Sequence, residues 1–106
     1  MKILFLGDVV GLSGCRKITN DLLDQIKKKD IDFVIINGEN ADDTGVGLTK
    51  EICQNFFDNG VDVITTGNHV WDQKDLMKFI EIENRLLRPK NLFEPAPGKG
   101  LSLIHI

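Results

Sequence analysis

The 106-residue chain has few cysteines, no long apolar run and no excess of basic residues. Cys15 and Cys53 are its two cysteines, and they have neither a metal-binding spacing nor the density of a disulfide framework. The net charge of −3 gives no basic patch of the kind that long nucleic acids need. The opening apolar run is too short to span a membrane, and it holds Asp8 in place of a cleavage site. We therefore expect a cytoplasmic protein that binds neither membranes nor long nucleic acids.

What the chain does contain is three apolar runs that each end in a glycine and a polar cluster, within residues 3–8, 33–40 and 61–69. Continuous β-branched runs are typical of buried parallel strands, and open α/β sheets bind ligands at the carboxyl ends of such strands. A glycine before each cluster lets the backbone turn sharply toward the site. The sequence therefore predicts one shared site, formed by Asp8, Glu39, Asn40, Asn68 and His69.

These five residues have the chemistry of a site for divalent metal ions. Carboxylates, amide oxygens and an imidazole suit hard or borderline divalent metals, whereas thiolate-seeking metals would need cysteines. Glu39, with two carboxylate oxygens, is the natural bridge between two ions. Dinuclear sites of this kind hydrolyse phosphate esters, with a metal-bound hydroxide attacking phosphorus. His69 lies next to a ligand and is available to protonate the leaving oxygen.

Each residue also has an ordinary structural explanation. An Asp after a strand is commonly a helix cap or a turn residue, Asn-Gly and Gly-Asn are frequent in turns, and a single His is commonly a surface residue. Their recurrence after three successive strands favours a shared site over unrelated turns.

The segments between the strands have the apolar spacing of helices. The first helix is expected over residues 15–29, with one apolar face and three lysines in its last turn. The second is expected from Thr49, as N-cap, to Gly60. The order of elements predicts an α/β fold, βαβαβα, with parallel strands and right-handed crossovers.

A third helix is expected to begin at Asp72, with Asp75 three residues on in the manner of a capping box. Its buried residues should be Leu76, Phe79 and Ile80. Beyond it, three prolines in residues 86–100 favour a loop or an extended connection.

The polar clusters resemble the motifs of a known enzyme family. Residues 7–8 (Gly-Asp), 37–40 (Asn-Gly-Glu-Asn) and 67–72 (Gly-Asn-His-Val-Trp-Asp) are similar to the first three motifs of calcineurin-like metallophosphoesterases, and most of all to the bacterial YmdB family. Members of that family are 2',3'-cyclic-nucleotide 2'-phosphodiesterases. The resemblance covers residues 1–100. It implies a metal-dependent phosphodiesterase acting on a small cyclic nucleotide or phosphodiester, and the N-terminal half of a four-layer αββα sandwich.

The resemblance also implies a role for each site residue. Asp8 and Asn40 would bind the first metal ion, and Glu39 would bridge both ions. Asn68 would bind the second ion, and His69 would be the proton donor. The two ions in such proteins are typically iron or manganese.

Two features depart from the wider superfamily. Val10 stands where many members have a metal-binding histidine, and in the YmdB branch Asn40 takes that role. Family members are also longer, and their second half supplies further metal-binding histidines, whereas His105 is the only other histidine here. We therefore expect this chain to be nearly inactive alone. An uncovered sheet edge also predicts marginal stability or self-association. A homo-oligomer is therefore one possible state of the chain.

We expect the domain to span residues 1–100. Residues 101–106, Leu-Ser-Leu-Ile-His-Ile, match one reading frame of a common sequencing adapter, and we interpret them as a non-native scar. The alternative is a genuine apolar strand after Gly100.

Other functions fit the sequence less well. A receiver domain would need a phosphorylatable Asp where Asn68 stands, and a dinucleotide-binding domain would need a Gly-x-Gly-x-x-Gly motif after the first strand, which is absent. The alternative that stays open is a non-enzymatic nucleotide- or phosphate-binding regulatory module. Residues 42–47 could form a lid over the site, although an ordinary turn is the favoured interpretation.

Overall fold

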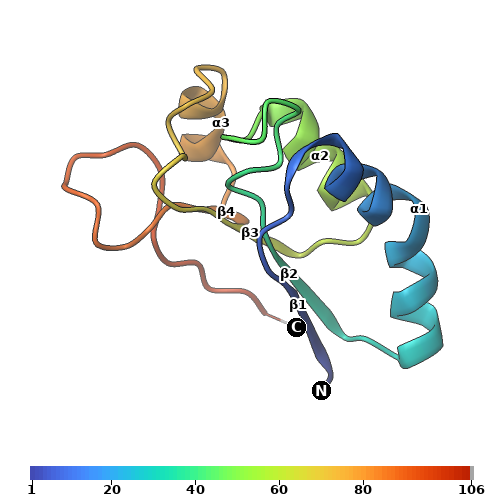
Figure 1. Ribbon diagram of the computed structural model, residues 1–106. Coiled ribbons are helices and arrows are strands. Elements are labelled where there is room, and N and C mark those ends of the chain that lie inside the picture. Colours follow the sequence, from blue (N-terminus) through green and yellow to red (C-terminus); the bar gives the residue numbers. More distant parts are fainter. Residues whose placement is uncertain (106) are drawn as a thin grey trace.

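The computed structural model describes residues 1–105, which form four parallel strands alternating with three helices (Figure 1). The elements are β1 (Ile3–Leu6), α1 (Gly11–Lys29), β2 (Phe33–Asn37), α2 (Lys50–Asp58), β3 (Val63–Thr65), α3 (Leu76–Ile82) and β4 (Leu86–Leu87). The strands form one sheet in the order β1-β2-β3-β4, and every neighbouring pair is parallel. The α/β fold with parallel strands is thus confirmed.

The strand register brings the carboxyl ends of the first three strands together. Leu6 of β1 lies opposite Ile36 of β2, and Asn37 lies opposite Thr65 of β3. The pairing continues beyond the strands, because the Val9 amide donates to the carbonyl of Asn37 at 3.0 Å. The three polar clusters therefore begin side by side at one end of the sheet.

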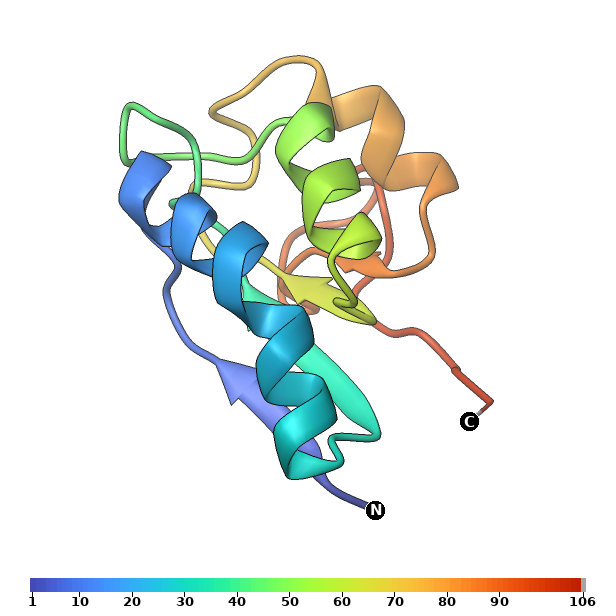
Figure 2. The ribbon, with the colours of Figure 1, turned by 90° about the vertical axis from the view of Figure 1, so that its right-hand side faces the viewer.

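All three helices follow crossovers on the same face of the sheet; Figure 2 shows α1 and α2 in front of the strands, and α3 (orange) above and to the right of the sheet. A sheet built in one direction with crossovers of one hand places its helices on a single face. On the helix-facing side, Ile36 and Ile64 are fully buried. On the opposite side, Ile3 is 57% exposed and Phe5 is 59% exposed, so this face of β1 is open.

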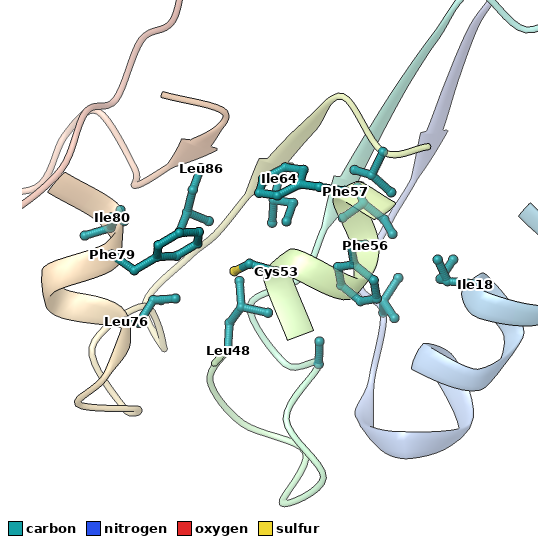
Figure 3. Close-up of a cluster of buried hydrophobic side chains, with 14 of the residues drawn as sticks. Ile18, Leu48, Cys53, Phe56, Phe57, Ile64, Leu76, Phe79, Ile80 and Leu86 are labelled. Atoms are coloured by element: carbon teal, nitrogen blue, oxygen red, sulfur yellow. The ribbon is translucent and has the colours of Figure 1, made fainter. Parts of the chain in front are cut away.

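The core lies between the helices and the sheet (Figure 3). Phe56 and Cys53 of α2 are fully buried near Ile64, and α3 contributes three further apolar side chains. Fully burying one such aliphatic or aromatic side chain contributes about 1.5–3 kcal/mol. The predicted burial of Leu76, Phe79 and Ile80 is confirmed.

Both cysteines are free thiols. Burial raises the pKa of the Cys53 thiol far above its usual value, which keeps this residue protonated and unreactive. No helix in residues 1–105 is long and apolar enough to cross a bilayer. Residues 101–105 have no assigned strand or helix.

The second helix starts as predicted, while the starts of the other two differ. The Thr49 hydroxyl accepts from the Ile52 amide at 3.2 Å and caps α2. α1 begins at Gly11, four residues before the predicted start, because Gly11 adopts a left-handed backbone (φ 60°) that turns the chain directly into the helix. α3 begins at Leu76 rather than at Asp72.

The late start of α3 has a physical cause. The side chain of Asp72 is engaged by His69, and the carboxylate of Asp75 accepts from the Lys50 amide at 3.2 Å instead of capping its own helix. A fourth strand, β4, was also not predicted, since two residues are too short to show a strand pattern.

Candidate metal centre

Asp8 follows β1 in a left-handed backbone conformation, with φ 46°. Such a conformation costs a residue with a side chain about 1–3 kcal/mol, and residues held in it cluster at functional sites and at helix ends, as with Asp30 at the C-cap of α1. The turn is fixed on its far side, because the Gly11 amide donates to the carbonyl of Asn40 at 2.9 Å. The Asp8 carboxylate in turn accepts from the Asn40 side-chain amide at 2.8 Å. The structure thus brings two of the predicted ligands into direct contact.

The segment after β2 contains buried acceptors without partners. In the described part of the chain, three buried side-chain polar atoms lack a hydrogen bond, and all three are oxygens from residues 37–40: Oδ1 of Asn37, Oε2 of Glu39 and Oδ1 of Asn40. An unpaired buried acceptor costs about 1–3 kcal/mol. A cation at the strand ends would satisfy such oxygens, so the residues present fit a metal site.

Gly67, after β3, makes room for the carboxylate of Glu39. A Cβ atom placed on Gly67 would overlap Oε2 of Glu39 and lie 2.6 Å from Oε1. Gly67 does not have a positive φ, so its function is close approach and not the sharp turn predicted from the sequence. This contact connects the segment bearing Glu39 with the segment bearing Asn68.

His69 forms a pair with Asp72. Its Nδ1 lies 2.7 Å from Oδ2 of Asp72, and both side chains are rather more than one-third exposed. An ionised carboxylate can only accept, so Nδ1 carries the proton and Nε2 is left available to a substrate. Sequence reasoning missed this role of Asp72, although the His-x-x-Asp spacing was visible.

Asn68 is the least constrained of the predicted residues. It is exposed, and no hydrogen bond within residues 1–105 connects its side chain to the other four. The same part of the chain holds no metal-binding group of three or more His, Cys, Asp or Glu residues. Two of the four predicted metal ligands are asparagines, which do not count toward such a group, so the ligand set stays a prediction.

Comparison with known proteins identifies the family. A sequence model described as YmdB-like protein matches residues 4–106. The chain belongs to the YmdB-like family. The matched residues contain all three motifs described above and continue past Gly100.

Relatives of this YmdB-like chain include an enzyme and two solved structures. The 2',3'-cyclic-nucleotide 2'-phosphodiesterase of Bacillus subtilis strain 168 is 45% identical over 105 residues, which is 98% of this chain and 39% of that protein. The crystal structure of a hypothetical protein from Thermus thermophilus is 37% identical, with a TM-score of 0.91 over all of this chain and 40% of its own. A Mycoplasma pneumoniae phosphatase is 36% identical, with a TM-score of 0.84 over 92% of this chain and 36% of its own. The chain therefore spans about two-fifths of the length of these relatives.

Proposed function

We propose that the full-length protein is a metal-dependent phosphodiesterase that hydrolyses 2',3'-cyclic nucleotides. The observation that carries this proposal is the group of unpaired buried oxygens in residues 37–40, beside Asp8 at the shared strand ends. The substrate class is supported by the name of the Bacillus subtilis relative. Free thiols at Cys15 and Cys53 fit a reducing compartment, and we propose the cytoplasm.

Four residues would hold two divalent ions, which we propose to be iron or manganese. Asp8 and Asn40 would bind the first ion, Glu39 would bridge, and Asn68 would bind the second. Bound divalent ions would neutralise phosphate charge and supply a nucleophile at neutral pH. Because four donors cannot fix the geometry of two ions, further ligands are expected from the rest of the full-length protein.

His69 acts on the leaving group. With Nδ1 donating to Asp72, the imidazolium form of His69 carries its second proton on Nε2 and can deliver that proton to the ribose oxygen as the bond from this oxygen to phosphorus breaks. The imidazole is then left neutral, with its remaining proton on Nδ1. Asp72 does not touch the substrate in this scheme and is a positioning residue. General acid catalysis of this kind contributes about 10²–10⁴-fold to the rate.

The test is to measure metal content and cyclic-nucleotide hydrolysis in the full-length protein, its Glu39→Ala variant and its Asn68→Ala variant. Both variants should lose bound metal and activity together. Glu81→Ala removes an exposed carboxylate on α3 and is the control, expected to match wild type. Tight nucleotide binding without turnover by the metal-loaded wild type would instead support a regulatory binding module.

A further inference from the structure

The loop of residues 42–47 packs against the segment that carries Asp72. The side-chain amide of Gln73 donates to the carbonyl of Val46 at 3.3 Å. Gly47 is buried, and a Cβ placed on it would lie 2.9 Å from Cγ of Gln73 and 3.1 Å from Cβ of Asp72. The backbone at Gly47 therefore lies directly behind the partner of His69, with no space for a side chain.

The loop is well suited to act as a fixed support, because it is closed by its own hydrogen bonds. The amide of Asp42 donates to the carbonyl of Gly47 at 3.0 Å, and the amide of Gly45 donates to the carbonyl of Asp42 at 2.8 Å. The buried Asp42 carboxylate also accepts from the Thr44 hydroxyl at 2.6 Å and from the Thr44 amide at 3.1 Å. These bonds favour the ordinary turn over a mobile lid.

Asp72 needs such a support. Its side chain is 39% exposed, and a carboxylate with that much freedom can adopt other rotamers in which it no longer meets His69. Within residues 1–105 its carboxylate is hydrogen-bonded to His69, and nothing on its own side chain holds it from the other direction. A Cβ at position 47 would lie 3.1 Å from Cβ of Asp72, so only a residue without a side chain leaves Asp72 in this position.

We infer that Gly47 is a positioning residue for the proton donor: its missing side chain sets the place of Asp72, and Asp72 sets the tautomer and direction of His69. This inference rests on the proposed function, in which His69 protonates the leaving oxygen. Gly47 thus joins Asp72 and His69 as a third residue that controls proton donation. It belongs to a loop that contributes no metal ligand and does not touch the substrate.

The chain offers a matched pair of variants for the test. Gly47→Ala and Gly45→Ala each add one methyl group to the same loop, at φ +85° and +84° respectively, so both place alanine at the same unfavourable φ. A Cβ on Gly45 meets nothing within 4 Å, whereas one on Gly47 meets Asp72 and Gln73. Any difference between the two variants therefore reports the contact and not the strain.

The first measurement is the tautomer of His69, read from the ring nitrogens by NMR of the full-length protein at a pH where the imidazole is neutral. The signal is assigned by its loss in His69→Asn. Wild type and Gly45→Ala should keep the proton on Nδ1, and Gly47→Ala should shift it toward Nε2. An unchanged tautomer in Gly47→Ala would overturn the inference, and so would an equal shift in Gly45→Ala.

The second measurement compares two substrates at equal metal content. A 2',3'-cyclic nucleotide has a poor leaving group that needs a proton, while bis(4-nitrophenyl) phosphate has a good one that does not. Gly47→Ala should lose roughly tenfold or more in kcat on the cyclic nucleotide and much less on the nitrophenyl ester. Equal losses on both would contradict positioning of the proton donor. If wild type hydrolyses neither, the proposed function fails, and the tautomer alone decides the role of Gly47.

Discussion

The sharpest test of the proposed metal centre is Gly67→Ala, a change that replaces no proposed ligand. Gly67 lacks a positive φ, so alanine is compatible with its backbone. The new Cβ would nevertheless lie 2.5 Å from Cδ of Glu39, where ordinary contact begins at 3.4 Å. The Glu39 carboxylate would therefore have to retreat by about 1 Å, and a misplacement of that size can cost on the order of 10²-fold in activity.

We expect Gly67→Ala to bind metal about 10–100-fold more weakly than wild type, the range found when a group that orients a ligand is lost. Metal affinity would be measured by titrating the metal-free full-length protein with Mn²⁺, and phosphodiesterase activity would be followed in parallel. Gly7→Ala is the control, because a Cβ there meets only a Phe5 ring carbon at 3.8 Å. Wild-type affinity and activity in Gly67→Ala would refute the assignment of Glu39 as the bridging ligand.

Four further outcomes follow from the structure. His69→Ala should keep its metal content and slow hydrolysis of cyclic nucleotides by about 10²–10⁴-fold, measured by steady-state kinetics. Phe5→Lys should raise the monomer fraction of the 106-residue chain in size-exclusion chromatography, because Phe5 is 59% exposed on the open face. Arg88→Ala should cost about 1–3 kcal/mol, and so lower the Tm by several degrees, since the buried guanidinium donates to two carbonyls and a carboxylate. Glu39→Ala should abolish any rise of the Tm on adding Mn²⁺.

Each of these has a contradicting result. Loss of metal in His69→Ala would make it a ligand and not the proton donor. A sharp two-state melt from a monomer of the unmodified chain would remove the basis for the Phe5 variant. Lys90→Ala changes an exposed neighbour and is the control for Arg88→Ala. If the two variants had the same Tm, the buried hydrogen bonds of Arg88 would contribute little to stability. A metal-dependent rise of the Tm in Glu39→Ala would place the binding site elsewhere.

Much of the fold could be predicted from the sequence, because the local apolar and capping patterns favour the same elements that the tertiary packing stabilises. The apolar runs became β1, β2 and β3, and Thr49 caps α2. The predictions that were wrong concern positions where one sequence pattern fits two different structural roles. Asp75 fits a capping box by spacing, yet its carboxylate binds the Lys50 amide, a contact between residues 25 apart that no local rule contains.

The candidate site could be predicted as a set of residues but not as a geometry. Topology alone placed Asp8 and Asn40 together, since parallel strands end at one edge. The support of Asp72 by Gly47 depends on two loops meeting in space, which a single sequence does not reveal. The role of Gly67 was missed for a related reason, because close approach and turning both call for glycine.

Two of the three unpaired oxygens at the proposed site belong to asparagines and the third to Glu39. An amide oxygen brings no charge to offset an ion, so its desolvation is compensated only when the ion is bound. An unpaired buried acceptor costs about 1–3 kcal/mol, so an ion bound by the buried oxygens of residues 37–40 would stabilise the fold. Metal binding and folding stability should therefore be coupled in this protein, with the segment Asn37-Gly38-Glu39-Asn40 as the place where they meet.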